Sequence, residues 1–203
     1  MKSLIQQGAE AKIFLQVLND PATIYKERIP KGYRHPELDK QIRTRRTRSE
    51  SKILIKAKKI GANVPQVIST DKFNLEIEFI EGDRLSETLN DYPEKKQFEV
   101  MKQIGEQTAK LHENNIIHGD LTTSNTLLKE DKVFIIDFGL GFISIKLEDK
   151  AVDLHLIKQA LEAKHWQNHG ALFKQFLKGY KWTDAKKVEE KLVTVEKRGR
   201  YKH

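Results

Sequence analysis

The spacing of apolar residues divides the chain into two regions with different predicted structures. In the first third, short segments rich in β-branched and aromatic residues predict strands. These strands are expected at 12–17, 22–26, 67–70 and 75–79, with a turn at 19–21. A mixed apolar and basic segment between them predicts a helix at 38–59, which ends before Gly61 and Pro65.

After Gly82, apolar residues recur at intervals of three or four, which is typical of helices. Helices are expected at 95–114, 152–161, 171–178 and 184–197, and two short strands at 126–128 and 133–136. We therefore predict an α+β fold with two lobes. The expected parts are a β-rich N-lobe at 1–80, a reduced helical C-lobe at 81–190 and a basic C-terminal tail at 191–203, with a hinge at 79–82.

The composition is that of a folded domain with an apolar core. Of 203 residues, 38% are hydrophobic and 33% are charged, and no segment has the roughly 18 apolar residues of a membrane-spanning helix. The chain has no cysteine, which excludes disulfide, thiolate-zinc, iron–sulfur and cysteine-nucleophile chemistry. The first residues lack the apolar stretch of a secretory signal, so a cytoplasmic location is expected.

The net charge of +8 is concentrated in two segments. Residues 40–59 hold nine basic side chains and only one acid, Glu50, and residues 181–203 hold eight basic and four acidic side chains. Two basic patches on a mildly acidic body favour a polyanionic partner, most simply nucleic acid contacted through its phosphates. The alternative is a solvated helix face. The arginines concerned are Arg43, Arg45, Arg46, Arg48, Arg198 and Arg200.

The sharpest chemical signal lies between residues 118 and 139. Residues 118–125 read His-Gly-Asp-Leu-Thr-Thr-Ser-Asn, and Asp137 follows twelve residues after Asn125, at the end of an apolar strand. Phosphoryl transfer requires a carboxylate that orients the acceptor, here Asp120, and oxygen ligands for Mg²⁺ beside the phosphates. Asn125 and Asp137 are the predicted Mg²⁺ ligands. Alone, each of the three could be a turn residue, but their order and spacing favour a catalytic set.

A phosphate site also needs a cation, and Lys26 in a predicted strand fits this role. Glu50, in the following predicted helix, is expected to hold it, as in the lysine–glutamate clamp of kinases. Taken singly, both could be ordinary surface residues. The remaining nucleotide contacts are expected in a covering loop and at the hinge; they are Gly8, Ala9, Glu10, Ala11, Ile77, Glu78 and Ile80.

These motifs, and several further strings, resemble the small atypical kinase subunit of the KEOPS complex, the p53-related protein kinase family, which is related to the RIO kinases. The resemblance runs essentially from end to end. It rests on 7–11 (Gln-Gly-Ala-Glu-Ala), 31–39 (Lys-Gly-Tyr-Arg-His-Pro-Glu-Leu-Asp), 45–50, 118–125, 137–139 (Asp-Phe-Gly), 149–154 and 198–200. It implies a minimal bilobal protein-kinase-like fold that binds ATP and Mg²⁺. It also implies ATPase and Ser/Thr autokinase activity in support of threonylcarbamoyladenosine formation in tRNA.

The same resemblance implies partners. The C-lobe is expected to dock on the catalytic tRNA-modifying subunit, the N-lobe on a small regulatory subunit, and the basic patches and tail on tRNA. Glycine stands at position 119, where signalling kinases carry arginine, and only 64 residues follow Gly139, too few for the usual peptide-docking helices. Water, the protein itself or a partner held in complex is therefore a better acceptor than a free peptide.

Two alternative functions stay open at this stage. A small-molecule phosphotransferase of the aminoglycoside or choline kinase type shares the His-Gly-Asp-x4-Asn pattern, but usually has a larger helical lobe. A largely non-catalytic scaffold for RNA and protein is the second alternative.

Three histidines are also considered as candidate functional residues. His118 is expected to support the catalytic loop structurally. His165 and His169 are expected to form a surface pair rather than a metal site.

Overall fold

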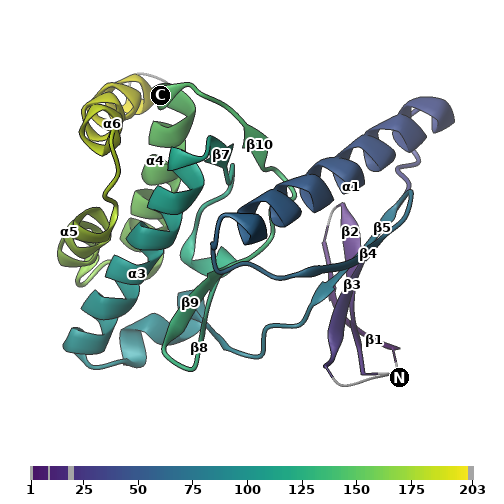
Figure 1. The fold of residues 1–203 in the computed structure, drawn as a ribbon, viewed down its shortest axis with the longest axis horizontal. Coiled ribbons are helices and arrows are strands. Elements are labelled where there is room, and N and C mark those ends of the chain that lie inside the picture. Colours follow the sequence, from purple (N-terminus) through teal and green to yellow (C-terminus); the bar gives the residue numbers. More distant parts are fainter. Residues whose placement is uncertain (1, 9, 18–20, 201–203) are drawn as a thin grey trace.

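The computed structural model describes residues 2–8, 10–17 and 21–200, and side chains as far as Arg198. It confirms the α+β class, with a β-sheet in the N-terminal region and helices gathered in the C-terminal region (Figure 1). The strands of the first region are β1 (Lys2–Gln7), β2 (Ala11–Gln16), β3 (Thr23–Arg28), β4 (Val67–Thr70) and β5 (Asn74–Glu78). Residues 19 and 20 of the predicted turn lie outside the described residues.

The five strands form one antiparallel sheet in the order β1-β2-β3-β5-β4. Helix α1 (Pro36–Lys59) separates β3 from β4 in the chain, begins with a proline in its first turn and ends before Gly61, whose φ is 75°. Its buried face includes Glu50, Leu54 and Ala57, spaced by four and three residues. Because residues at this spacing share one side of a helix, Glu50 points inward with the apolar residues.

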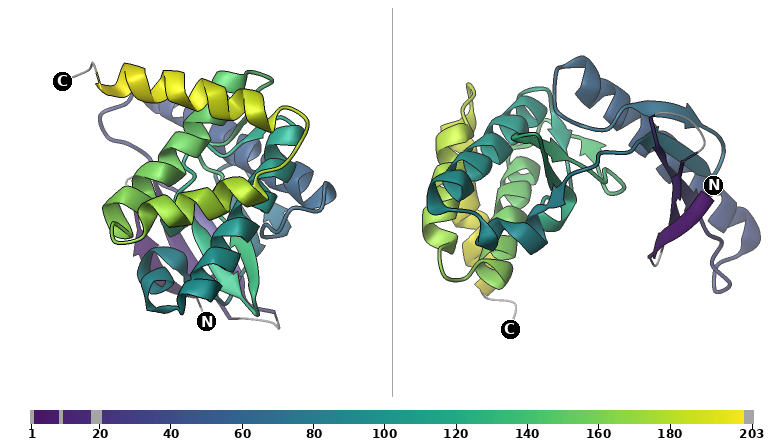
Figure 2. Two further views of the ribbon diagram at one scale, coloured as in Figure 1. Left: turned by 90° about the vertical axis from the view of Figure 1, so that its left-hand side faces the viewer. Right: turned by 90° about the horizontal axis from the view of Figure 1, so that it is seen from below.

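The helical region contains α2 (Leu85–Thr88), α3 (Glu94–Glu113), α4 (Leu147–Lys164), α5 (His169–Gly179) and α6 (Ala185–Arg200), with 3-10 turns η1 (Leu89–Asp91) and η2 (Thr123–Asn125). Its strands are β6 (Asp83–Arg84), β7 (Ile116–Ile117), β8 (Thr126–Lys129), β9 (Lys132–Ile135) and β10 (Phe142–Ile143). Helix α6 packs on α4 (Figure 2). The predicted start of the tail, at residue 191, falls inside α6.

Glycine permits the close crossing of α3 and α5. A Cβ atom at Gly105 would stand 2.0 Å from the Phe176 carbonyl oxygen, and one at Gly179 would stand 1.9 Å from the Lys102 carbonyl oxygen. Both distances are far below a van der Waals contact, so any larger residue would force the helices apart. The crossing brings the end of α5 against the middle of α3, at residues 102–106.

Among the residues that the structure describes, no helix is long and apolar enough to cross a lipid bilayer.

Candidate active site

Lys26 lies on β3 and is bonded to two carboxylates. Its Nζ is 2.7 Å from Glu50 Oε1 and 2.7 Å from Asp137 Oδ1. The predicted contact between Lys26 and Glu50 is therefore present. Arg28, two residues further along the same strand and hence on the same face, donates from Nη2 to Glu50 Oε2. The side chain of Glu50 is 2% exposed, so one buried carboxylate is paired with two cations.

The pKa shifts of this cluster favour its charged forms. Burial alone would lower the pKa of Lys26, but Glu50 and Asp137 raise it above its ordinary value. Burial would likewise raise the pKa of Asp137, but Lys26 and the Gly139 N–H hold it below its ordinary value. At neutral pH the site therefore presents a fixed cation next to a carboxylate.

The β8–β9 hairpin brings Asn125 and Asp137 to one end of the cluster. The N–H of Ile136 donates to the Asn125 carbonyl oxygen at 2.9 Å, which joins the residues just outside the two strands. Asp137 follows with φ of 62°, a left-handed conformation that turns its side chain out of the strand. Its carboxylate then reaches Lys26 and accepts from the N–H of Gly139.

Asp120 stands on the same side, held by Asn125. The side-chain Nδ2 of Asn125 donates to both the carbonyl oxygen and Oδ2 of Asp120, each at 2.9 Å. Because this nitrogen is occupied, the Oδ1 atom is the part of the Asn125 side chain left to bind a cation. Asp120 itself is exposed. The structure thus brings Asp120, Asn125, Asp137 and Lys26 into one connected group.

The loop that carries Asp120 is fixed by its neighbours. His118 Nε2 donates to the Ile136 carbonyl oxygen at 3.0 Å, and its Nδ1 accepts from the N–H of Asp120 at 3.2 Å. These bonds bear out a supporting role for His118. Gly119 has φ of 79°, and a Cβ atom there would stand 2.5 Å from the Leu140 carbonyl oxygen. A glycine, rather than an arginine, is therefore required at this backbone position.

Asp153 is a residue whose importance the sequence did not reveal. It is fully buried on α4, and its carboxylate accepts from the N–H groups of His118 at 2.7 Å and Gly119 at 2.8 Å. The available signals were its place in the string at 149–154 and its spacing of four residues from the buried Ile157, which puts both on one side of the helix. A carboxylate in an apolar helix face must find partners inside the protein.

The covering loop is held by a bond within its own backbone and by ion pairs to α1 and the segment before it. The N–H of Gly8 donates to the Ala11 carbonyl oxygen at 3.0 Å, whereas Ala9 lies outside the described residues. Glu10 turns toward α1 and the segment before it, where its carboxylate meets Arg46 at 2.8 Å and Arg34 at 3.4 Å. Because the Glu10 side chain is engaged in ion pairs, the backbone of this residue is the part left to contact a phosphate.

At the predicted hinge, two backbone N–H groups, those of Glu78 and Phe79, are already bonded within the protein. The N–H of Glu78 donates to the Gln66 carbonyl oxygen and that of Phe79 to the Ala22 carbonyl oxygen. Ile80, which is buried, is the next residue of the predicted hinge. Ile77 is half-buried and packs against the core.

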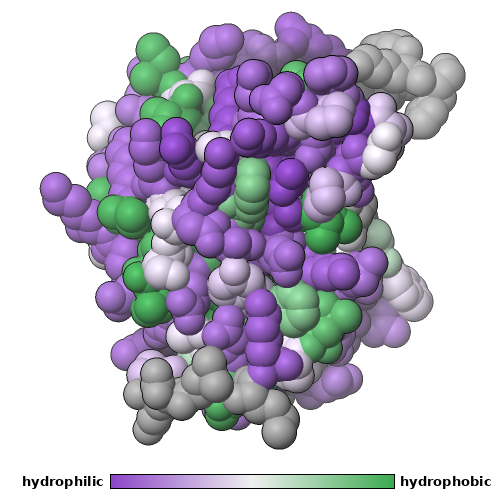
Figure 3. All heavy atoms as spheres, turned by 90° about the vertical axis from the view of Figure 1, so that its right-hand side faces the viewer, coloured by the Kyte–Doolittle hydropathy of each residue, from purple (hydrophilic) through white to green (hydrophobic). Residues whose placement is uncertain are grey.

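The arginines of the first basic patch have two different environments. Arg43 donates to Asp39 at 2.7 Å, and Arg46 pairs with Glu10, so both serve contacts within the protein. Arg45 and Arg48 are exposed, and they line a groove of about 610 Å³ along α1 together with three lysines, Lys40, Lys52 and Lys72. The face that carries the N-terminal sheet and the start of α1 is dominated by hydrophilic residues (Figure 3).

The second basic patch is also partly paired. Arg198 donates to Glu148 Oε1, and Lys191 lies 3.5 Å from the other oxygen of the same carboxylate. These ion pairs tie α6 to the start of α4. The side chain of Arg200 lies outside the described part of the chain.

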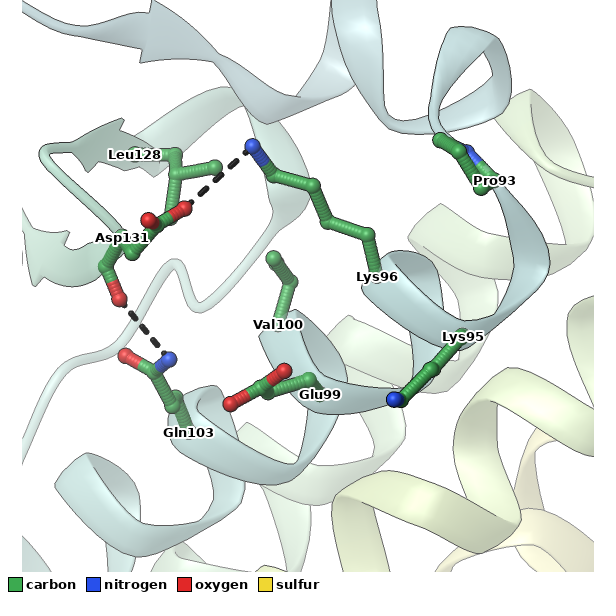
Figure 4. A pocket seen from close by; sticks show the side chains of 8 residues that line it. All are labelled: Pro93, Lys95, Lys96, Glu99, Val100, Gln103, Leu128 and Asp131. Atoms are coloured by element: carbon green, nitrogen blue, oxygen red, sulfur yellow. Dashed lines mark hydrogen bonds and ion pairs between the residues drawn. The ribbon is translucent and has the colours of Figure 1, made fainter.

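A further pocket, of about 340 Å³, lies at the far end of the β8–β9 hairpin (Figure 4). Two side chains that line the pocket, Lys96 and Gln103, contact Asp131 in the hairpin turn. Lys96 pairs with Asp131 at 3.3 Å, and Gln103 donates to the Asp131 carbonyl oxygen at 2.9 Å. This pocket is separated from Asn125 and Asp137 by the length of the two strands and takes no part in the candidate active site.

The prediction that His165 and His169 form a surface pair is wrong for His165. It is buried at the end of α4, where its ring nitrogens contact Asn90 Oδ1 at 2.7 Å and Thr123 Oγ1 at 3.2 Å. Burial lowers its pKa, and nearby Lys164 lowers it further. His169 starts the next helix, so the two histidines do not share one helix face. Within the described residues, no cluster of three potential metal-ligating side chains occurs.

Sequence comparison matches the chain to a known protein family. The RIO domain family model matches residues 16–143. "KEOPS complex subunit Bud32" of Pyrococcus abyssi is 44% identical over 98% of this chain and 96% of its own length. "Probable bifunctional tRNA threonylcarbamoyladenosine biosynthesis protein" of Methanosarcina mazei is 37% identical over 98% of this chain, which spans only 35% of that longer relative.

Solved structures with low sequence identity share the fold. The Rio2 kinase of Chaetomium thermophilum, in a complex with ADP/Mg²⁺ and phosphoaspartate, has a TM-score of 0.69 at 14% identity, over 99% of this chain and 72% of that one. The streptomycin–ATP complex of APH(2")-IIa has a TM-score of 0.63 at 13% identity, over 95% and 81%. The chain therefore has a kinase-like fold and belongs to the RIO domain family, in the group of the KEOPS Bud32 subunits.

Proposed function

We propose that this chain catalyses Mg-ATP-dependent phosphoryl transfer, as an ATPase and Ser/Thr autokinase, within a KEOPS complex that supports threonylcarbamoyladenosine formation in tRNA. The observation that carries the proposal is the placement of Lys26 between Glu50 and Asp137, with Asn125 and Asp120 on the same side. We further propose that residues 1–203 form one two-lobed domain in the cytoplasm, with the site between the lobes.

The donor set fits Mg²⁺ and ATP. Asp137 offers a carboxylate and Asn125 an amide oxygen, which are ligands that Mg²⁺ accepts beside phosphate oxygens. Gly139 leaves space next to the ion pair, since a Cβ atom there would stand 3.0 Å from Asp137 Oδ1 and 3.3 Å from Lys26 Nζ. Bound Mg²⁺ would supply neutralisation of the developing phosphate charge.

Each side chain then has one task. On nucleotide binding, Lys26 exchanges its bond to Asp137 for phosphate oxygens, while Glu50 keeps it in place. Asp137 is thereby freed to act as a ligand. Asp120 orients the hydroxyl or water acceptor and receives its proton. The N–H of Ile80 is the remaining hinge donor for a base, with the Glu78 carbonyl oxygen as acceptor and Ile77 behind the ring.

Exposed apolar residues support the proposed protein partners. Leu140 and Ile145, on the segment after Asp137, are 57% and 79% exposed and would suit docking of the catalytic tRNA-modifying subunit on the C-lobe. Leu4 and Ile5 are each 52% exposed on the edge strand β1, where a small regulatory subunit could contact the N-lobe.

The acceptor class can be tested with γ-labelled Mg-ATP. We expect label from wild type to appear as inorganic phosphate and on the chain itself, because only seven residues separate Gly139 from α4 and leave little structure to hold a separate substrate. Parallel reactions would add kanamycin or choline. Preferential transfer of label to either compound would contradict the proposal and favour a small-molecule phosphotransferase.

We expect tRNA to bind the exposed arginines of the groove along α1 rather than the arginines that are paired within the protein. An Arg45→Ala/Arg48→Ala double variant is expected to weaken tRNA binding by the assembled complex and to reduce the salt slope of log K by about two, one for each lost phosphate contact. Truncation after Lys197 is expected to act in the same direction. Filter binding across a range of salt concentrations measures both.

A Lys95→Ala/Lys174→Ala variant, which removes two exposed charges from the helical region, is the matched control. If the control reduces the slope as much as the arginine pair does, the effect is one of net charge and the groove is not the tRNA surface. Unchanged binding in both the arginine pair and the truncation would assign the RNA contact to other subunits.

A further inference from the structure

Arg28 is a second cation at the candidate active site, next to Lys26. It ends β3 two residues after Lys26, so both side chains leave the same face of the sheet. The side chain of Arg28 is 5% exposed, and its Nη2 donates to Glu50 Oε2, while Lys26 donates to Oε1. Each oxygen of this buried carboxylate therefore has its own cation.

The backbone of Arg28 is bonded on both sides. Its N–H donates to the Phe73 carbonyl oxygen at 3.1 Å, and its own carbonyl oxygen accepts from Arg43 Nη1 at 3.3 Å. Arg43 is in turn paired with Asp39 at 2.7 Å. The end of β3 is thus held in place, and with it the point from which the guanidinium group reaches Glu50.

Arg28 also borders the space beside Gly139. A Cβ atom at Gly139 would stand 3.0 Å from Asp137 Oδ1, 3.3 Å from Lys26 Nζ and 3.7 Å from Arg28 Nη2. All three charged groups therefore lie within 4 Å of one point, which glycine leaves open. An anion at this point would have two cations as neighbours.

The charges of the cluster explain why two cations are useful. Lys26, Arg28, Glu50 and Asp137 contribute two positive and two negative charges, which sum to zero. When Asp137 acts as a metal ligand, Lys26 and Glu50 alone would cancel each other and offer a phosphate no net charge. Arg28 adds a permanent positive charge, which salt screens weakly because the group is buried.

We propose that Arg28 is a positioning and charge-balancing residue for nucleotide binding, which neutralises Glu50 and so leaves the charge of Lys26 to the phosphates. The proposal rests on the Mg-ATP-dependent function above. The lysine–glutamate clamp of kinases has one cation for one carboxylate. In this chain the clamp has two.

Two substitutions at residue 28 separate the charge from the bulk of the side chain. Lysine and methionine both have unbranched side chains of similar length, and only lysine is charged. We expect Arg28→Met to raise the Kd for Mg-ATP at least about tenfold and to leave the Kd for adenosine, which has no phosphate, unchanged. Arg28→Lys should keep both Kd values within about threefold of wild type, because an ammonium group can also donate to Glu50. Calorimetric titration measures both ligands.

The double variant Arg28→Met/Glu50→Gln tests the charge balance itself. Glutamine keeps an oxygen that can accept from Lys26 and removes the negative charge that has lost its second cation. The charge of the cluster then returns to zero, so the Kd for Mg-ATP should return to within about threefold of wild type. Arg28→Gln is a second neutral variant in case Arg28→Met does not fold, and the same selective loss of Mg-ATP binding is expected.

Lys59→Met is the matched control, since it removes one exposed positive charge from the last turn of α1. Its Kd for Mg-ATP should equal that of wild type. Equal weakening of Mg-ATP and adenosine in the neutral variants, wild-type affinity for Mg-ATP in them, a double variant as weak as Arg28→Met, or an equal loss in Lys59→Met would overturn the proposal. If the binding pattern is as expected but wild type releases no γ-phosphate, the phosphoryl-transfer function fails and the role of Arg28 in nucleotide binding stands.

Discussion

An Asp120→Asn variant is expected to lose ATP turnover by about 10²–10⁴-fold while it binds Mg-ATP as tightly as wild type. Asp120 is exposed, and its carboxylate is held by Asn125 rather than by Lys26, so it is free to orient an acceptor and receive its proton. Asparagine keeps the shape of the side chain and removes the basic oxygen. Single-turnover hydrolysis and calorimetric titration with Mg-ATP measure the two effects separately.

Asp131→Asn is the control for Asp120→Asn. It removes an exposed carboxylate from the far end of the β8–β9 hairpin, where its partner is Lys96. Turnover by this variant should match that of wild type. If Asp120→Asn keeps full turnover, or loses nucleotide binding together with turnover, Asp120 does not have the role proposed for it.

Glu50→Ala is expected to lower the free energy of unfolding by about 3–5 kcal/mol and to abolish turnover. The carboxylate lies between Lys26 and Arg28, and the side chains of these cations are only 11% and 5% exposed. Removing it leaves Arg28 buried without that carboxylate and leaves Lys26 with Asp137, the partner it must release to bind phosphate. Urea unfolding at pH 7 and ATP hydrolysis provide the measurements.

A surface ion pair provides the comparison for Glu50. Glu106, on α3, lies 3.6 Å from Lys102 with both side chains about half exposed, and Glu106→Ala should change stability by no more than about 0.5 kcal/mol. Glu50→Gln, which removes the charge but keeps one of the two acceptor oxygens, should fall between the two. A loss in Glu50→Ala no larger than in Glu106→Ala would show that the buried carboxylate does not hold the cations in solution.

The sequence predicts the longer elements well because their signals are local. The helix predicted at 38–59 is α1 (Pro36–Lys59), and the strand predicted at 67–70 is β4. The paired strands β6, β7 and β10 have two residues each, too few for any periodicity, and they were not predicted. Their pairing depends on tertiary contacts that a pattern along the chain does not encode.

Candidate site residues were predictable where a motif places them on a known type of element. Lys26 on a strand and Glu50 on the next helix meet as expected. Arg28 and Asp153 were missed, since their roles come from burial next to groups distant in sequence. His165 was misread for a related reason, because α4 ends at Lys164 and the four-residue spacing to His169 spans a break between helices.

Charge counting likewise treats all arginines of a segment alike. In the folded protein these arginines differ in their contacts. Arg43 is paired with Asp39, and Arg46 is paired with Glu10. Arg45 and Arg48 are exposed. A charge total therefore predicted a basic surface without identifying which side chains form it.

The central claim is that ATP is turned over at the Lys26–Asp137 cluster in the service of tRNA modification. Release of labelled γ-phosphate from Mg-ATP tests it most directly, with wild type and Asp137→Ala, each alone and then with the catalytic tRNA-modifying subunit and tRNA. The account predicts phosphate release by wild type that rises with partner and tRNA, and none by Asp137→Ala even though that variant still docks on the partner. Equal phosphate release by the two proteins would contradict it.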